Sequence, residues 1–310
     1  MKIAVLAGGV GGARFVQALT EVVAPRDVTV IANVGDDLEV HGLHVSPDLD
    51  TLLYTLAGLG DEERGWGRAG ETWHARETVE LLGGEAWFRL GDRDLGLHLV
   101  RTDALRRWEK LSAVTSRIAR AVGLEVKLLP ATDDRLRTRV RTPAGEFEFQ
   151  EWFVARGHRD RADEVVYDGA AEARPAPGVL KALDEADLIA IAPSNPFVSI
   201  GPILAVAEIR AAVERRRDRV VAVSPLIGGR AVKGPADAMF TSLAGGTGAG
   251  QVTDCYKDLI EALVLDEADA ADAEAVADRG VRPLVTRTLM SDPDARRALV
   301  ETVLGLVTVT

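Results

Sequence analysis

The hydrophobic positions at the start of the chain follow the periods of a strand, a helix and a second strand. Residues 2–7 form a short apolar run that predicts a buried strand, and the glycine-rich residues 8–12 predict a turn. Residues 13–24 place their apolar side chains near one face of a helix, and residues 28–34 again have the pattern of a buried strand. This order is typical of the opening of a doubly wound parallel sheet.

A second unit of the same kind lies further along the chain. Residues 188–192 and 220–223 have the pattern of buried strands, and residues 202–217 between them predict a helix, with Pro202 suited to its first turn. We therefore expect an α/β fold with a doubly wound, Rossmann-like, mostly parallel sheet.

The middle of the chain has a different pattern. Residues 61–120 carry helical patterns, and residues 137–153 alternate as in a β-hairpin. We interpret residues 61–160 as an inserted, largely helical cap subdomain, with residues 1–60 and 161–310 forming the Rossmann-like core. The alanine-rich, acidic residues 266–278 predict a solvated helix or linker.

Composition narrows the functions that this fold could have. The chain has 310 residues and a net charge of −11, which opposes a broad electrostatic grip on nucleic acid. An anionic ligand would therefore need local cations or main-chain N–H groups. Cys255 is the only cysteine, which excludes an intrachain disulfide. We find neither a signal-peptide pattern nor an apolar run of about 18 residues, so we expect a cytoplasmic protein without a membrane partner.

The glycine-rich turn is a candidate phosphate-binding site. Glycines between a strand and a helix let the main chain approach a ligand, and the free N–H groups at the start of a helix attract anions. A P-loop is disfavoured because Ala13 and Arg14 follow Gly12 in place of lysine and a hydroxyl residue, and Arg14 also breaks the dinucleotide-binding fingerprint. The alternative interpretation is a tight turn that only packs the helix on the sheet.

Carboxylates gather after the second predicted strand, at the edge where parallel sheets bind ligands. The cluster comprises Asp36, Asp37, Glu39, Asp48 and Asp50. We expect Asp48 and Asp50 to lie on a turn or short extended piece ahead of a helix at residues 51–59. Carboxylate oxygens suit Mg²⁺, which takes one or two of them together with phosphate oxygens; the alternative is that one aspartate only caps the helix.

Other polar residues are weaker candidates for the same site. His41 and His44 are spaced as a metal pair would be, but without a third ligand they are better explained as ordinary histidines. The segment WFRLGDRD offers Arg89 and Arg93 for an anionic or planar ligand, or for salt bridges at the surface. Further polar groups follow later strand ends, at Ser194, Asn195 and Lys233.

Several segments together resemble one family. They are LAGGVGGARF, VGDDLEVHGLHVSPDLDTLLYTLAG, ERGWGR, WFRLGDRD, RPAPGVL, APSNPFVSIGPILAV and VAVSPLIGGRAVKGPA. In this order they resemble the 2-phospho-L-lactate transferase (CofD/FbiA) family of deazaflavin coenzyme F-420 biosynthesis, over nearly the whole chain to about residue 266. The later segment LMSDPDARRAL is similar to the bacterial branch, which is associated with phosphoenolpyruvate transfer.

This resemblance implies a Mg²⁺-dependent transferase. The terminal ribityl hydroxyl of the deazaflavin 7,8-didemethyl-8-hydroxy-5-deazariboflavin would attack a phosphorus of a GDP-activated three-carbon acid, giving coenzyme F-420-0 or its dehydro form and releasing GMP. In the bacterial branch an enolpyruvyl donor is expected rather than a 2-phospho-L-lactyl donor. The family also implies a homodimer.

The resemblance also suggests roles for individual residues. Asp48 and Asp50 would be catalytic, and the metal would lie near Asp36, Asp48 and Asp50. The acceptor would contact Asp50, Arg89, Ser194 and Asn195. The donor phosphates would contact Gly8, Gly9, Gly11, Gly12, Arg14 and Lys233. Many relatives have GGTGTxK at the turn, so the absence of threonine at Val10 and Gly12 places more weight on the main chain and on Arg14.

Two points stay open at this stage. Asp50 could be a general base or a metal ligand. The second glycine-rich segment, residues 244–250, is interpreted as a loop because no clear strand precedes it. The competing function is a non-catalytic regulator similar to the YvcK-like proteins, which bind nucleotide sugars; a dehydrogenase is disfavoured by the broken fingerprint.

Overall fold

A computed structural model of the chain describes residues 1–308. Its centre is a seven-stranded sheet in the order β14-β13-β10-β9-β1-β2-β5, in which every neighbouring pair is parallel. The strands are β1 (Ile3–Ala7), β2 (Val28–Ala32), β5 (Lys127–Pro130), β9 (Leu188–Ile191), β10 (Val220–Val223), β13 (Ala262–Asp266) and β14 (Arg282–Thr286). The expected doubly wound parallel sheet is confirmed.

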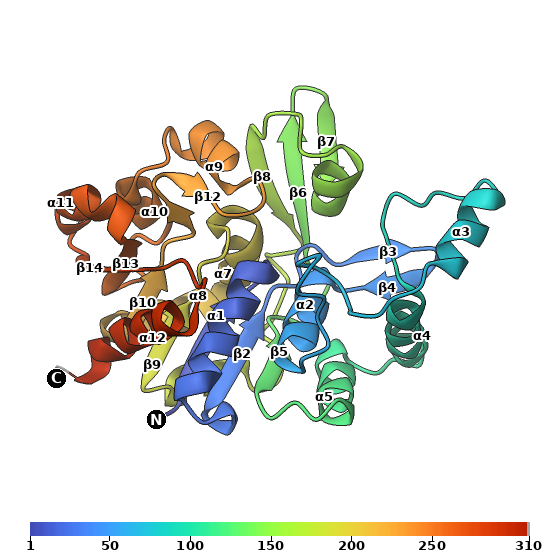
Figure 1. The fold of residues 1–310 in the computed structure, drawn as a ribbon, viewed down its shortest axis with the longest axis horizontal. Helices are drawn as coiled ribbons and strands as arrows, with labels where there is room; N and C mark the ends of the chain where they lie inside the picture. The colour runs from blue at the N-terminus through green and yellow to red at the C-terminus, as the bar shows by residue number, and fades with distance from the viewer. Residues whose placement is uncertain (309–310) are drawn as a thin grey trace.

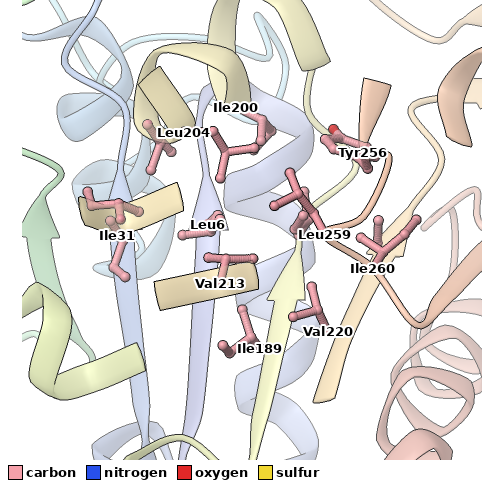
Figure 2. Close-up of a cluster of buried hydrophobic side chains, with 14 of the residues drawn as sticks. Leu6, Ile31, Ile189, Ile200, Leu204, Val213, Val220, Tyr256, Leu259 and Ile260 are labelled. Carbon is pink, nitrogen blue, oxygen red and sulfur yellow. The ribbon is translucent and has the colours of Figure 1, made fainter. Parts of the chain in front are cut away.

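Helices cover both faces of this sheet (Figure 1). One face carries α1 (Gly9–Val22), α2 (Pro47–Leu56), α5 (Leu111–Ala121) and α12 (Pro293–Thr308). The other carries α6 (Val179–Glu185), α7 (Gly201–Ala205), α8 (Ala207–Arg215), α10 (Ala249–Cys255) and α11 (Ala273–Ala277). Alternate residues of each strand therefore enter different cores: Val5 joins the first, and Leu6 joins the second, which Figure 2 shows with Ile31, Ile189 and Val213.

The remaining elements surround one end of the sheet. The hairpin β3 (Leu38–Val40) and β4 (Leu43–Val45) projects to one side with α3 (His74–Leu81) and α4 (Asp92–Arg106) (Figure 1). A separate antiparallel sheet contains β6 (Arg137–Thr142), β7 (Gly145–Glu148) and β8 (Glu164–Asp168). A short hairpin, β11 (Leu226–Ile227) with β12 (Arg230–Ala231), precedes α9 (Ala236–Met239).

The structure divides the middle of the chain differently from the prediction. The hairpin at residues 137–153 is present as β6 and β7, but its third strand, β8, lies beyond residue 160. The predicted cap also contains β5, which pairs with β2 as an edge strand of the central sheet. Residues 61–160 therefore do not form one cap: α5 and β5 belong to the layers of the central sheet and lie between the α3–α4 region and the separate sheet of β6, β7 and β8.

Two predicted helices have different bounds. Helix α2 begins at Pro47 and not at residue 51, because the fixed φ of proline suits the first helical position; Asp48 and Asp50 thus lie in its first turn. The helix predicted at residues 202–217 is two helices, α7 and α8, separated by Val206, whose backbone is extended and whose side chain is fully buried.

Among the described helices, none alone is long and apolar enough to cross a membrane. The segments Pro196–Ala205 and Ala207–Arg215 meet the length and composition criterion only when taken as a pair, and they are bent by 93°.

Arg216 joins the end of α8 to the end of α6. Its guanidinium donates hydrogen bonds to the main-chain oxygens of Leu183, Asp184 and Ala186, at 2.6 Å for Ala186. We expect Arg216→Ala to lower the free energy of unfolding by about 1–3 kcal/mol, because these carbonyls lose a charged donor. Arg215→Ala, which removes only an exposed ion pair with Asp184, should change it by less than about 0.5 kcal/mol. Urea unfolding measures both, and equal losses would contradict this role for Arg216.

Candidate functional site

A single cleft at the carboxyl end of the central sheet brings most of the predicted site residues together. Its volume is about 1060 Å³, within the size range of small-molecule sites. The predicted residues that line it are Gly8, Gly9, Gly11, Arg14, Asp36, Asp48, Asp50, Arg89, Ser194, Asn195 and Lys233. A smaller cavity of about 550 Å³ shares part of this lining, including Arg14 and Trp66.

The glycine turn presents the start of helix α1 to the cleft. Gly8 is the residue before the helix, and Gly9 has φ +67°, a conformation that favours glycine. The Ser194 hydroxyl donates to the Gly8 carbonyl at 2.7 Å and accepts from the Gly8 N–H at 3.3 Å. Ser194 therefore braces the turn. Gly12 is buried behind it, where a Cβ would lie 2.7 Å from the Ser194 hydroxyl oxygen, and it does not line the cleft; its contact with donor phosphate stays a prediction.

Asn195 also has a local structural role. Its side-chain oxygen accepts from the Phe197 N–H at 2.9 Å and so caps the helical turn Pro196–Ile200. Its side-chain nitrogen lies 3.4 Å from the Met239 sulfur. Both polar atoms of Asn195 are thus engaged inside the protein, although the residue lines the cleft.

Two carboxylates on the cleft wall share one amide. The Asn33 side-chain nitrogen lies 2.8 Å from Asp36 Oδ1 and 2.9 Å from Asp48 Oδ2, and all three side chains are buried. Gln150 donates to the other oxygen of Asp36 at 2.8 Å. Burial raises the pKa of Asp48 to about 6 against the hydrogen bonds from Asn33 and the Gly9 N–H. Burial, followed by repulsion from Asp48, raises the pKa of Asp36 well above its usual range.

Asp50 lies in a different electrostatic environment. Both of its oxygens accept from the guanidinium of the buried Arg101 on helix α4, at 2.9 Å for Oδ2. Its charge is therefore compensated within the protein, whereas the described structure places no cationic side chain in hydrogen-bond contact with Asp36 or Asp48. The three aspartates that were expected to act together therefore differ. The charge of Asp50 is compensated by Arg101, whereas, within residues 1–308, no cationic side chain compensates the charges of Asp36 and Asp48 through a hydrogen bond.

These environments decide which residues could hold a metal. The residues described by the structure contain no group of three or more His, Cys, Asp and Glu side chains arranged to bind an ion. Asp36 and Asp48 nevertheless fit Mg²⁺, which binds through one or two carboxylates and takes its other ligands from phosphate and water. Asp50 has less uncompensated charge for a cation, because Arg101 donates to both of its oxygens, and its role as a metal ligand stays a prediction.

Among the described residues, the histidine pair belongs to no group of three or more potential metal ligands. The His44 Nε2 atom lies 2.9 Å from Asp37 Oδ2 and 3.1 Å from the Ser46 hydroxyl, on the strand β4. His41 occupies the turn of the β3–β4 hairpin with φ +52°. The interpretation of both as ordinary histidines is supported.

Three cationic side chains remain available in the cleft. Arg14, Arg89 and Lys233 line it and have neither a hydrogen bond nor an ion pair within residues 1–308. Most other arginines are paired with carboxylates or carbonyls; Arg93, on the same segment as Arg89, points toward Gly70 and not into the cleft. The cleft therefore combines unpaired positive charge with the start of a helix, as an anion-binding site requires.

Some residues of the segment WFRLGDRD stabilise a neighbouring helix, and others line the cleft. Asp92 accepts from the Thr72 hydroxyl and from the N–H groups of His74 and Ala75, so it caps helix α3. Trp87 and Phe88 line the cleft next to Arg89 and pack edge to face, with ring centroids 5.6 Å apart. The segment thus supplies aromatic surface as well as charge.

Four aromatic rings that line the cleft in two separate pairs, which we call the aromatic wall, are the main feature that the sequence analysis missed. Besides Trp87 and Phe88 the wall contains Phe149 and Phe153, which are stacked with centroids 5.4 Å apart and also line the cleft. Flat aromatic ligands bind well to such surfaces. Trp87 and Phe88 lie in a segment that was interpreted through its arginines, and Phe149 and Phe153 lie in or next to the segment that was interpreted only as a hairpin.

Asn33, Arg101 and Gln150 were also missed as site residues. Asn33 directly follows β2, so its position at the carboxyl edge of the sheet was a usable signal. Arg101 and Gln150 come from α4 and from the segment after β7, and no local motif links either of them to the aspartates that they contact.

The second glycine-rich segment is a loop, as predicted. Gly245 has φ +73° and ends a helical turn, and helix α10 begins at Ala249. The Ala249 N–H donates to the Asp272 carboxylate at 2.9 Å. A carboxylate of the protein therefore already lies at the start of this short helix.

Comparison with known proteins gives concordant matches along almost the whole chain. The family model described as "2-phospho-L-lactate transferase CofD" matches residues 3–295. Curated proteins named phosphoenolpyruvate transferase are similar over nearly their full length. The protein from Streptomyces griseus is 43% identical over 312 residues, covering 99% of this chain and 98% of that protein. The protein from Thermobifida fusca is 44% identical over 314 residues, covering 96% and 95%.

Solved structures support the fold. Two crystal structures of the protein BH3568 from Bacillus halodurans, one described as a member of the UPF0052 family, match with a TM-score of 0.64. Each covers 98% of this chain and 98% or more of the other chain, at 16% sequence identity. At this identity the match shows a shared architecture.

Proposed function

Because this chain belongs to the 2-phospho-L-lactate transferase CofD family, we propose that it transfers a phosphoenolpyruvyl group from a GDP-activated donor to a deazaflavin. The terminal ribityl hydroxyl of 7,8-didemethyl-8-hydroxy-5-deazariboflavin attacks the phosphorus that carries the enolpyruvyl group. A new P–O bond forms, the bond from this phosphorus to the GMP oxygen breaks, and the hydroxyl proton passes to bulk water. The products are dehydro coenzyme F-420-0 and GMP.

One observation carries this proposal: a single cleft joins an anion-binding end to an aromatic wall. The glycine turn, Arg14 and Lys233 provide N–H groups and positive charge for the diphosphate of the donor. The cavity that continues past Arg14 and Trp66 offers room for the guanosine. The names of the relatives support an enolpyruvyl rather than a 2-phospho-L-lactyl donor.

The other end of the cleft suits the acceptor. The deazaflavin ring is flat and aromatic, and Trp87, Phe88, Phe149 and Phe153 offer it rings for stacking. In this arrangement Arg89 contacts polar atoms of the ring or of the ribityl chain. The ribityl hydroxyl then points toward the carboxylates beside the glycine turn.

We propose that Asp36 and Asp48 hold the Mg²⁺ that this family is expected to use. When bound, Mg²⁺ would neutralise the charge of the reacting phosphates. The protein contributes the rest of the chemistry by position: N–H groups of the glycine turn and Arg14 stabilise negative charge on the departing GMP. Asp50 orients the attacking hydroxyl, since a carboxylate held by Arg101 can still accept a hydrogen bond.

The test is product formation by the purified protein. It would be incubated with Mg²⁺, the deazaflavin and a guanylyltransferase that forms the donor from GTP and either phosphoenolpyruvate or 2-phospho-L-lactate. Mass spectrometry should detect dehydro coenzyme F-420-0 and GMP with phosphoenolpyruvate. Product with 2-phospho-L-lactate alone would overturn the choice of donor. Absence of product with both acids, together with binding of a nucleotide sugar, would overturn the transferase in favour of a regulator.

Arg89 offers a prediction with a matched control on the same segment. Arg89→Ala should raise the KM for the deazaflavin about tenfold, because a cation beside the aromatic wall contributes roughly 1–2 kcal/mol to binding. Arg93→Ala removes a similar charge from outside the cleft and should leave the KM within about twofold. Steady-state kinetics with varied deazaflavin measures both values. The same KM in both variants would remove Arg89 from the acceptor site.

A further inference from the structure

Asp50 and Arg101 form a buried, two-pronged ion pair at the wall of the cleft. The Asp50 side chain is 7% exposed and lines the cleft from the first turn of α2, and the Arg101 side chain is 3% exposed and lies behind it on α4. Arg101 Nη1 donates to Asp50 Oδ2 at 2.9 Å, and Nη2 donates to Oδ1. This geometry fixes both the position and the plane of the carboxylate.

The guanidinium is oriented mainly by Asp50. Its Nε atom is buried and has no hydrogen-bond partner within the described chain, so no acceptor on that side holds it. Burial would lower the pKa of Arg101, but the charge of Asp50 and the hydrogen bonds to it outweigh burial, and the pKa is raised. Arg101 therefore remains charged, and all of its hydrogen bonds to carboxylate oxygens go to Asp50.

A second set of contacts fixes α4 against α2. His98 lies between Arg101 and Asp94, with its Nδ1 atom 3.4 Å from Arg101 Nη1 and its Nε2 atom 3.3 Å from Asp94 Oδ1. The Tyr54 hydroxyl, on α2, donates to the same Asp94 oxygen. The position of Arg101 relative to Asp50 is thus set by two helices that are joined by buried polar contacts.

We propose that Arg101 is a positioning residue of the transfer site, which holds Asp50 as a fixed hydrogen-bond acceptor for the incoming hydroxyl and keeps it from binding the metal. This inference rests on the proposed function. Asp50 lies only two residues from Asp48 in the same helical turn. A freely rotating Asp50 could turn toward the cation and away from the hydroxyl, whereas the two contacts with Arg101 hold Asp50 in one orientation.

The inference predicts effects that are specific to the acceptor. Arg101→Lys keeps the charge but loses the two-pronged contact; we expect its KM for the deazaflavin to rise at least about tenfold and kcat to fall at least about fivefold. Binding of the fluorescent deazaflavin in the absence of Mg²⁺ should weaken by the same factor as the KM. The KM for the donor should stay within about twofold.

Two further variants keep the test informative if Arg101→Lys folds poorly. Arg101→Gln combined with Asp50→Asn replaces the ion pair by two neutral amides. This double variant should have the thermal stability that a single substitution loses, but it should not recover deazaflavin binding. Arg107→Gln removes an exposed arginine from the end of the same helix, where it pairs with Asp103, and should behave as the wild type.

The outcomes separate the inference from the proposed function. The inference would be overturned, and the proposed function would stand, if the wild type makes product and Arg101→Lys has the same deazaflavin binding and kcat as Arg107→Gln. Recovery of deazaflavin binding in the neutral double variant would also overturn it, because Arg101 would then be only structural. Wild-type protein that makes no product with any donor would overturn the proposed function.

Discussion

Asp48→Asn should reduce the rate of transfer at least about 100-fold, the largest effect expected from a single polar substitution in the cleft. Asp48 lies 2.9 Å from the shared amide of Asn33 and accepts from the Gly9 N–H, so it connects the predicted metal site to the glycine turn. Asparagine keeps the shape of the side chain but removes the charge that would hold Mg²⁺. Asp103→Asn, an exposed substitution outside the cleft, is the control.

The same substitution should change how stability depends on pH. Because the pKa of Asp48 is raised to about 6 in the folded protein, ionisation of this group opposes folding. Its stabilising contribution is complete below the unfolded pKa of about 4 and is lost as the pH rises through about 6. Without metal, the wild type should lose up to about 3 kcal/mol relative to Asp48→Asn over this interval. Urea unfolding at pH 4 and pH 7.5 measures this difference.

Added Mg²⁺ should reverse that loss in the wild type only. A cation bound by Asp36 and Asp48 favours their ionised forms and stabilises the folded protein by mass action. If the stability of the wild type and of Asp48→Asn depends on pH in the same way and responds equally to Mg²⁺, Asp48 is not part of the metal site.

Gly8→Ala should be nearly as damaging, although it adds only one methyl group. An alanine Cβ at this position would lie 2.3 Å from Asp48 Oδ2 and 2.9 Å from the Ser199 Cβ. Either the Asp48 carboxylate or the turn must move by about 1 Å, which can reduce the rate about 100-fold. Crowding should also lower the free energy of unfolding by about 1–3 kcal/mol.

Gly96→Ala provides the matched control for the glycine turn. Gly96 lies within helix α4, and no heavy atom would approach its Cβ within 4 Å. We expect unchanged kinetics and a stability equal to the wild type or higher by up to about 1 kcal/mol. Turnover numbers and urea unfolding compare the two alanine variants. Wild-type turnover in Gly8→Ala would mean that the close approach to Asp48 is not needed.

The central sheet was predictable because its strands carry strong local signals. The predicted strands β1, β2, β9 and β10 are short runs of apolar residues followed within two residues by glycine, asparagine or proline, and the residues at those ends meet at one edge of a parallel sheet. Strands β5, β13 and β14 were not predicted, and β13 and β14 lack such a residue after them. This rule correctly placed Asp36, Asp48, Ser194 and Lys233 around one cleft. Family resemblance was needed to propose what the cleft binds.

The environment of each aspartate could not be predicted in the same way. Asp50 and Asp48 look equivalent in the sequence, and their difference arises from Arg101, which is brought to Asp50 from another helix. Such a contact depends on how α4 packs on α2, and no periodicity in the sequence encodes it. The start of α2 was missed because aspartates after a proline suit both a turn and the first turn of a helix.

The order of strands in the sheet has a consequence for biosynthesis on the ribosome. Strand β1 is made first, but one of its two neighbours, β9, pairs Leu188 with Ile3 and is made about 185 residues later. At roughly 5–20 residues per second, the apolar strand IAVLA emerges about 10–40 s before that neighbour exists. During this interval one edge of β1 is unpaired, and the nascent chain is open to aggregation or to capture by a chaperone. The glycine turn that follows β1 is thus among the first residues synthesised, and its contacts with residues that follow β9 form only late.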